Sequence, residues 1–187
     1  MKKKFALSFV ALASVALLAA CGEVNSGASN AAGNSVDEKT IKIGFNFEET
    51  GAVAAYGTSE QKGAQLAVDE INAAGGIDGK QIEVVDKDNM SETAEAASVT
   101  TNLVTQSKVS AIVGPATSGA TAAAVANATK AGVPLISPSA TQDGLTKGQD
   151  YLFIGTFQDS FQGKIISNDV SEKLNANKVV LYTDNAS

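Results

Sequence analysis

Apolar and polar positions change their period repeatedly along the chain after residue 40. Short apolar stretches typical of strands are separated by longer stretches whose apolar residues recur at helical spacing. The pattern predicts six strands, at residues 41–46, 81–86, 111–114, 133–137, 152–155 and 178–182. It predicts four helices, at residues 59–74, 91–107, 118–130 and 161–174. Alternation of strand and helix predicts an α/β fold, a doubly wound parallel sheet with helices on both faces.

Glycine, proline and capping residues indicate where these elements end. Gly75 and Gly76 are expected to end the first helix and Gly132 the third, because glycine readily takes the left-handed conformation found at helix ends. Ser91 is the candidate N-cap of the second helix. Pro134 has no amide hydrogen for a strand ladder, so we expect it at the start of the fourth strand.

The topology of such a sheet predicts where a ligand would bind. In open parallel sheets, ligands lie beyond the carboxyl ends of the strands, where the strand order reverses. Three loops of this chain follow the first, third and fourth predicted strands, at residues 48–58, 115–121 and 138–143. We therefore expect a binding cleft that these three loops line.

The first 20 residues have the pattern of a targeting segment. Residues 2–4 are lysines, and residues 5–20 form an apolar run interrupted only by Ser8 and Ser14. This run is shorter than the roughly 20 residues of a membrane span and fits a bacterial secretory signal. The tetrad that ends at Cys21 looks like a lipobox, where the cysteine is lipidated and the preceding bond is cleaved. The alternative is a free cysteine at the end of a membrane helix.

We accordingly expect a lipoprotein signal peptide at residues 1–20 and a flexible tether at residues 21–40. The tether is rich in small and polar residues and has no usable periodicity. The resulting protein would be extracytoplasmic and attached to the cell membrane through a lipid on Cys21.

The amino-acid composition excludes several classes of function and site. The chain carries 20 acidic and 14 basic residues, a formal charge of −6, and three of its lysines lie at the extreme N-terminus. Such an acidic chain without a basic patch argues against a nucleic-acid partner. It has no histidine and one cysteine, which excludes His-based catalysis, His metal sites and an internal disulfide. Phosphate-binding and nucleophile-elbow motifs are absent too, so we expect no enzyme, no cofactor and no metal.

Two loops carry candidate ligand-binding groups. Residues 117–121 open the third helix, where free amides and the helix dipole favour an anion and the Ser118 hydroxyl could add a hydrogen bond. The alternative is that Ser118 is only the N-cap of that helix. Residues 137–141 form a rigid turn that offers carbonyl groups and a hydroxyl, or alternatively an ordinary strand–helix connection.

Other residues near the expected cleft have two interpretations each. Tyr56 could place its ring in the cleft, or could be a tyrosine at the solvent edge. Asp86 and Asp88 are interpreted as loop-forming and capping carboxylates rather than catalytic ones. Glu48 and Glu49 are interpreted as solvated loop charges, or alternatively as negative charges near the cleft that could alter the choice of ligand.

Four stretches together resemble a known family. They are Gly-Ala-Val-Ala-Ala-Tyr-Gly at 51–57, the segment 63–79 with its Asn-Ala-Ala-Gly-Gly-Ile-Asp-Gly run, the segment 113–121, and Ile-Ser-Pro-Ser-Ala-Thr at 136–141. Over about residues 41–187 the chain is similar to the leucine/isoleucine/valine receptors of ABC importers. That resemblance implies the type I periplasmic-binding fold and a receptor for branched-chain amino acids. The alternative is a receptor or sensor of the same fold for another amino acid or amide.

The resemblance also implies residue roles. Ser118 matches the serine whose amide and hydroxyl hold the ligand carboxylate. Thr141 matches the threonine whose amide meets the carboxylate and whose hydroxyl meets the ammonium, and Ser139 matches a position whose carbonyl accepts from the ammonium. Tyr56 matches an aromatic residue of the side-chain pocket. Neighbouring positions of this predicted site are Ala116, Thr117 and Ala140.

Family members have two lobes and are about twice as long as this chain. The resemblance therefore implies an N-terminal ligand-binding lobe at residues 41–157. Residues 158–187 would be the crossover and the first helix and strand of a second, incomplete lobe, with a hinge near residues 157–160. The implied partners are an amino acid, an ABC permease and its ATPase subunits, and the receptor would be a monomer.

Overall fold

The computed structural model describes residues 39–174, 176 and 178–182. The signal peptide, Cys21 and almost all of the tether lie outside the described residues. Within them, five parallel strands form one sheet in the order β2-β1-β3-β4-β5. The strands are β1 (Thr40–Phe47), β2 (Gln81–Asp88), β3 (Ala111–Val113), β4 (Leu135–Ser137) and β5 (Leu152–Ile154). The predicted parallel α/β sheet is confirmed.

The four predicted helices are also present, with shifted ends. They are α1 (Ala54–Ala73), α2 (Thr93–Asn102), α3 (Ser118–Ala131) and α4 (Asp159–Asn168). Two of them continue as short π-helical segments, α2 into η1 (Leu103–Ser107) and α4 into η2 (Asp169–Lys173). No helix among the described residues combines the length and apolarity needed to cross a membrane.

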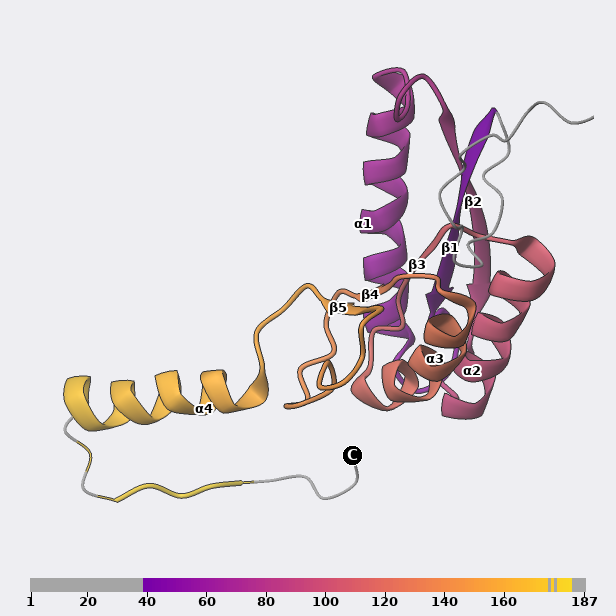
Figure 1. The fold of residues 1–187 in the computed structure, drawn as a ribbon. Helices are drawn as coiled ribbons and strands as arrows, with labels where there is room; N and C mark the ends of the chain where they lie inside the picture. Colours follow the sequence, from indigo (N-terminus) through magenta and orange to yellow (C-terminus); the bar gives the residue numbers. More distant parts are fainter. Residues whose placement is uncertain (1–38, 175, 177, 183–187) are drawn as a thin grey trace, which may run out of the picture. The chain divides into compact units, whose positions relative to one another are not determined.

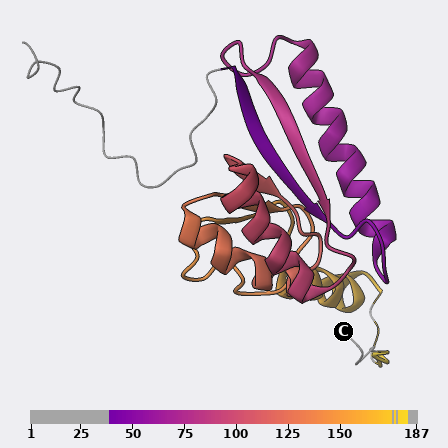
Figure 2. The same cartoon turned by 90° about the vertical axis from the view of Figure 1, so that its right-hand side faces the viewer.

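Helices cover both faces of the sheet, as Figures 1 and 2 show. One face of β1 and β2 packs against α1 in a core of four buried residues, Phe45, Phe47, Val68 and Ile82. The other face packs against α2, η1 and α3. That larger core includes Leu103, Ile112, Val125 and Leu135. Because side chains alternate across a strand, neighbouring residues of one strand serve the two different cores.

Glycines end α1 and α3 as predicted. Gly132 is in the left-handed conformation (φ 67°) at the end of α3, and its amide donates to Ala128 and Thr129. After α1, the Gly76 amide returns to the Ile71 carbonyl at 2.9 Å, and both Gly75 and Gly76 have positive φ. These bonds satisfy carbonyl groups that the helix itself leaves unpaired.

Two local predictions are wrong. Ser91 is not the N-cap of α2: its backbone is left-handed (φ 62°), and its hydroxyl donates to the Thr50 carbonyl at 2.6 Å. Glu92 occupies the cap position instead. Residues 178–182 form no strand, although the four residues after Lys178 are apolar or aromatic. Strand formation needs a neighbouring strand to pair with, and the described residues place none beside them, so Val180 and Leu181 are 93% and 86% exposed.

Candidate functional site

A cleft of about 440 Å³ lies at the carboxyl ends of the strands. The connection from β1 into α1, the loop after β3 and the loop after β4 all contribute to it. Its lining residues are Val53, Tyr56, Ala116, Thr117, Ser118, Ser139 and Thr141. The strand order reverses between β1 and β3, so the cleft occupies the place that the topology predicts.

Six of the seven predicted site residues line this cleft together. The exception is Ala140, which is buried and whose amide donates to the Ser137 hydroxyl at 3.2 Å. Sequence reasoning missed Val53, which stands three residues before Tyr56 in the loop already expected to line the cleft. A spacing of three residues places both side chains on one face where α1 begins, and that signal could have found Val53.

Two glycines allow the loops to approach closely enough to form the cleft. A Cβ atom on Gly57 would lie 2.2 Å from the Glu48 carbonyl oxygen, so α1 can cross the end of β1 only without a side chain there. Gly114 has φ +96°, and a Cβ on it would lie 2.2 Å from the Asn46 carbonyl oxygen. Any larger residue at either position would push the cleft loops away from β1.

Glu48 is a buried residue, so its interpretation as a solvated loop charge is wrong. Its side chain is fully buried, and its carboxylate accepts three hydrogen bonds from the loop after β3. The Ala116 amide donates to Oε2 at 2.9 Å, and the Thr117 amide and hydroxyl donate to Oε1 at 3.1 and 2.9 Å. Such charge-assisted bonds replace the water that a buried carboxylate would lose. Glu48 therefore fastens the β3–α3 loop to the end of β1.

The N-terminus of α3 opens into the cleft. Thr117 is its N-cap and accepts from the Ala120 amide at 3.4 Å, so the alternative that Ser118 is the N-cap is wrong. Glu48 already takes the amides of Ala116 and Thr117. In the part of the chain that the structure describes, the amides of Ser118 and Gly119 have no hydrogen-bond partner. The helix therefore presents two free donors at its positive end.

The loop after β4 is held in place by hydroxyl groups. The Ser139 hydroxyl donates to the Ala116 carbonyl at 2.9 Å, and the Ser137 hydroxyl donates to the Pro115 carbonyl at 2.6 Å. The Ser118 hydroxyl accepts from the Gln142 amide at 3.2 Å. These bonds tie the loops after β3 and β4 into one wall of the cleft.

The same loop contacts the start of α4. The Asp159 amide donates to the Thr141 carbonyl at 2.9 Å. The Ser160 amide and hydroxyl donate to the Asp143 carboxylate at 3.0 and 2.6 Å. The residues at which we expect a hinge are thus hydrogen-bonded directly to a loop that lines the cleft.

Tyr56 lies in the first turn of α1 and lines the cleft, with 66% of its surface exposed. Both interpretations of this residue describe its position, because the ring borders the cleft and also meets solvent. A ligand seated against it would cover apolar ring surface.

A group of carboxylates lies on the other side of the β1 terminus. Asp88 accepts from the amides of Glu49, Thr50 and Met90 and from the Thr50 hydroxyl, which confirms it as a loop-forming residue. Burial raises the pKa of Asp88, but these hydrogen bonds outweigh it and lower the pKa below its usual value. Burial, a hydrogen bond to Asp86 and the charges of Asp86 and Asp88 raise the pKa of Glu49 to about 7.

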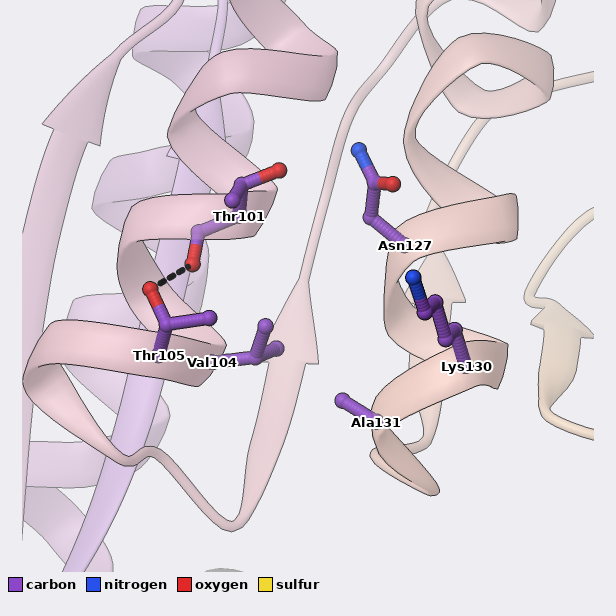
Figure 3. Close-up of a pocket in the computed structure, with 6 residues that line it drawn as sticks. All are labelled: Thr101, Val104, Thr105, Asn127, Lys130 and Ala131. Atoms are coloured by element: carbon purple, nitrogen blue, oxygen red, sulfur yellow. Dashed lines mark hydrogen bonds between the residues drawn. The ribbon is translucent and has the colours of Figure 1, made fainter.

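A second cavity, of about 280 Å³, lies between the ends of α2, η1 and α3 (Figure 3). Its hydroxyl and amide groups already bond to backbone: Thr101 and Thr105 donate to the carbonyls four residues earlier, and Asn127 donates to the Ala97 carbonyl. Helices that end here lead into the amino ends of β3 and β4, so this cavity lies at the edge of the sheet opposite the cleft. Among the described residues, no group of three or more Asp, Glu, His or Cys side chains is arranged to hold a metal ion.

Comparison with known proteins agrees with this geometry. The model of a family described as periplasmic binding protein matches residues 40–187. The leucine-, isoleucine-, valine-, threonine- and alanine-binding protein of Pseudomonas aeruginosa is 32% identical over 80% of this chain and 40% of its own length.

Two solved structures extend the comparison. The branched-chain amino acid transporter substrate-binding protein LivJ from Streptococcus pneumoniae, solved in complex with isoleucine, is 95% identical. It superposes with a TM-score of 0.77 over 80% of this chain and 43% of LivJ. The leucine-binding protein LivK from Thermotoga maritima is 30% identical, with a TM-score of 0.70 over 78% of this chain and 41% of LivK. The chain thus spans about two fifths of the length of the relatives it matches. The family match over residues 40–187, together with the parallel sheet and its cleft, shows that the chain belongs to the periplasmic binding protein family.

Proposed function

We propose that this chain forms the N-terminal ligand-binding lobe of an extracytoplasmic receptor for branched-chain amino acids. The receptor delivers leucine, isoleucine or valine to an ABC importer and catalyses no reaction. One observation carries this proposal: the amides of Ser118 and Gly119 are free at the positive end of α3, and Ser118 lines the cleft together with Ser139 and Thr141.

The donors of the cleft suit the carboxylate of an amino acid. Glu48 already accepts hydrogen bonds from the amides of Ala116 and Thr117. One further carboxylate, supplied by the ligand, would accept from the amides that remain free at the start of α3. The Ser118 hydroxyl accepts from the Gln142 amide and keeps its own hydrogen, which it can donate to the ligand carboxylate. The Ser139 carbonyl and the Thr141 hydroxyl are suited to the ammonium group.

The remaining lining is suited to an aliphatic side chain. Val53, Ala116 and the ring of Tyr56 present carbon rather than polar groups to the cleft. The names and titles of the pneumococcal and Pseudomonas relatives support branched-chain amino acids as the ligand class. Residues 41–157 would form this lobe, and residues 158–187 would lead into the second lobe that closes over the ligand.

The N-terminal sequence supports attachment to the membrane. A lipidated Cys21 would follow cleavage of the signal peptide at residues 1–20, and residues 21–40 would tether a monomeric lobe outside the cell. Stable attachment requires more than a single acyl chain, as in a diacylated cysteine. Labelling of growing cells with a radioactive fatty acid tests this: the parent chain should become labelled and Cys21→Ala should not.

A thermal-shift screen against all the amino acids tests the ligand class. We would use residues 22–187 of this chain joined to the remaining C-terminal part of LivJ from Streptococcus pneumoniae, called the fusion receptor below. A specific ligand at about 100 times its dissociation constant adds roughly 2.7 kcal/mol of stability. A shift confined to leucine, isoleucine and valine is the expected result. A shift with another amino acid or an amide alone would keep the receptor and reject the branched-chain ligand.

A further inference from the structure

Three polar side chains are fully buried and bonded to one another, and the proposed function does not use them. They are Asn46 on β1, Asn89 directly after β2 and Thr100 on α2, called the buried network below. The Asn46 side-chain amide donates to the Ala96 carbonyl at 3.0 Å and to the Thr100 hydroxyl at 2.9 Å. The Asn89 side-chain amide donates to the Asn46 side-chain oxygen at 3.0 Å. Buried polar groups that satisfy one another form a rigid unit, so Asn89 is held in one orientation.

Asn89 in turn fixes the position of Ser91. Its side-chain oxygen accepts from the Ser91 amide at 3.1 Å, in a turn typical of asparagine. Its backbone amide donates to the Phe47 carbonyl at 2.9 Å, which ties the same loop to the end of β1. Ser91 has φ 62°, a left-handed conformation that residues other than glycine rarely adopt. The bonds of Asn89 therefore hold the Ser91 backbone where it would not stay unaided.

The Ser91 hydroxyl bridges two backbone groups of the loop after β1. It donates to the Thr50 carbonyl at 2.6 Å and accepts from the Val53 amide at 3.2 Å. A serine hydroxyl has one hydrogen to donate and lone pairs with which to accept, so both bonds form at once. The loop approaches this closely because Gly51 has no side chain: a Cβ atom there would lie 2.9 Å from the Ser91 hydroxyl oxygen.

Val53 connects this bridge to the cleft. It lines the cleft and is the N-cap residue of α1, and no side chain of its own makes a capping hydrogen bond. Its carbonyl accepts from the Tyr56 amide at 3.0 Å, and Tyr56 lines the cleft too. Ser91 therefore supplies, from a different loop, an anchor for the start of the helix that carries both residues.

We propose that Ser91 is a positioning residue of the cleft, which sets the place of Val53 and Tyr56 and hence the size of the pocket for the side chain of the ligand. Its hydroxyl joins the start of α1 to the buried network. Without that hydroxyl, the Val53 amide has no acceptor and the wall formed by Val53 and Tyr56 moves away from the loop after β2. The anchoring of Val53 does not depend on the proposed function, whereas the effect on ligand choice rests on it.

Other residues hold the part of the cleft that would meet the charged ends of an amino acid. Glu48 fastens the loop before α3, and the Ser137 and Ser139 hydroxyls tie that loop to the loop after β4. Ser91 takes part in neither contact. Its removal should therefore affect the side chain of the ligand more than its carboxylate and ammonium groups.

Hydrogen exchange in the fusion receptor without ligand tests the anchoring of Val53. Ser91→Ala and Ser91→Gly should both speed amide exchange in residues 50–57 about fivefold, because both lack the hydroxyl. Residues 137–143 should exchange as in the parent. The matched control is Ser59→Ala, which removes an exposed serine hydroxyl that donates to the Ala55 carbonyl within α1, and it should leave residues 50–53 unchanged.

Ser91→Gly separates the hydroxyl from the backbone. Glycine adopts the left-handed conformation without strain, so a loss caused by the backbone would spare this variant. Exchange like that of the parent in Ser91→Gly, or unchanged exchange of residues 50–57 in Ser91→Ala, would overturn the proposal.

Binding to the fusion receptor then tests the choice of ligand. Ser91→Ala should weaken isoleucine binding about fivefold and alanine binding by less than about twofold, because the alanine methyl group reaches less of the apolar wall. Displacement titrations against isoleucine measure both affinities, including the weaker one. A merely structural role of Ser91 would lower the two affinities equally, and that result would also overturn the proposal. Faster exchange as expected, with no amino acid bound by the parent receptor, would instead reject the proposed function and support the anchoring of Val53.

Discussion

Two consecutive glutamates at the end of β1 lie in opposite surroundings. Glu48 is fully buried and receives three hydrogen bonds from the loop after β3. Glu49 faces the β2 side, where its neighbours Asp86 and Asp88 are acceptors like itself, and its pKa rises to about 7. Burial alone therefore does not decide the charge of a carboxyl group. The donors that the fold brings to a carboxyl group also matter, and Glu48 has three of them whereas Glu49 lies beside two further carboxylates.

The cleft side and the β2 side of the β1 terminus also differ in the hydrogen-bonding groups that they offer to a ligand. On the cleft side, donors exceed acceptors, since the Ser118 and Gly119 amides remain free after Glu48 has taken its share. On the β2 side, the carboxylates of Glu49, Asp86 and Asp88 lie close together, and Asp88 accepts the amides of Glu49, Thr50 and Met90. An anionic group of a ligand fits the first side and is repelled by the second.

Removing Glu48 should have the largest effect. Glu48→Ala leaves the buried amide of Ala116 and the half-buried amide of Thr117 without an acceptor, which costs about 2–5 kcal/mol of unfolding free energy. Chemical denaturation measures this loss. The control Glu83→Gln removes an exposed carboxylate from β2, opposite Lys42, and should change stability by less than about 0.5 kcal/mol. Equal stabilities of the two variants would contradict the structural role of Glu48.

Removing the Ser118 hydroxyl tests the donor side of the comparison. In the fusion receptor, Ser118→Ala should lose a hydrogen bond to a charged group worth roughly 1.5–3 kcal/mol, which is about tenfold to a hundredfold in affinity. Calorimetric titration with leucine measures it. Thr101→Ala, which removes an exposed hydroxyl near the second cavity, is the matched control and should bind normally. An unchanged dissociation constant for Ser118→Ala would refute the role of this serine.

Asp88 should contribute less to the unfolding free energy, and its contribution should be lost at acid pH. Its pKa is lowered in the folded state, so its stabilisation is present above its ordinary pKa and is lost as the pH falls through the lowered value. Asp88→Asn should cost about 1 kcal/mol at neutral pH. It should also flatten the loss of stability in acid, as measured by thermal unfolding over a pH series. A variant that loses stability in acid as steeply as the parent would contradict this assignment.

Glu49 should have the smallest effect, with the opposite sign. Because its folded-state pKa is raised from 4.5 to about 7, the unfolding free energy should decline as the pH rises between these two values. Glu49→Gln should remove that decline, by less than about 1 kcal/mol since the group is partly exposed. The same pH series measures it, with Glu70→Gln as the exposed control. A decline that persists in Glu49→Gln would locate the titrating group elsewhere.

The sequence pattern was sufficient for the sheet and for most of the cleft. The apolar period predicts five strands that the structure contains, and the topology rule then brings Tyr56, Ser118 and Thr141 to one edge. Both inferences depend on local spacing, which a sequence displays directly. Residues 178–182 show the limit of this reasoning, since an apolar run does not become a strand without a partner.

The roles of the acidic residues could not be predicted, because they depend on contacts between distant positions. Glu48 and the amide of Ala116 are 68 residues apart in the sequence. Nothing near Glu48 in the chain distinguishes it from Glu49. Ser91 precedes α2 as an N-cap would, yet its hydroxyl bonds to Thr50, 41 residues away. Only the folded arrangement decides which donor each oxygen meets.

One hydrogen bond and a place in the cleft lining make Thr141 a link between the cleft and α4. Its side chain borders the cleft, and its carbonyl oxygen holds the amide of Asp159, the first residue of α4. The peptide group is planar, so rotation of the Thr141 backbone turns that carbonyl as a rigid unit. A small movement of the Thr141 backbone in the cleft wall therefore also moves the acceptor of the Asp159 amide at the start of α4. A fluorescent dye attached near this junction would convert occupancy of the cleft into an optical signal.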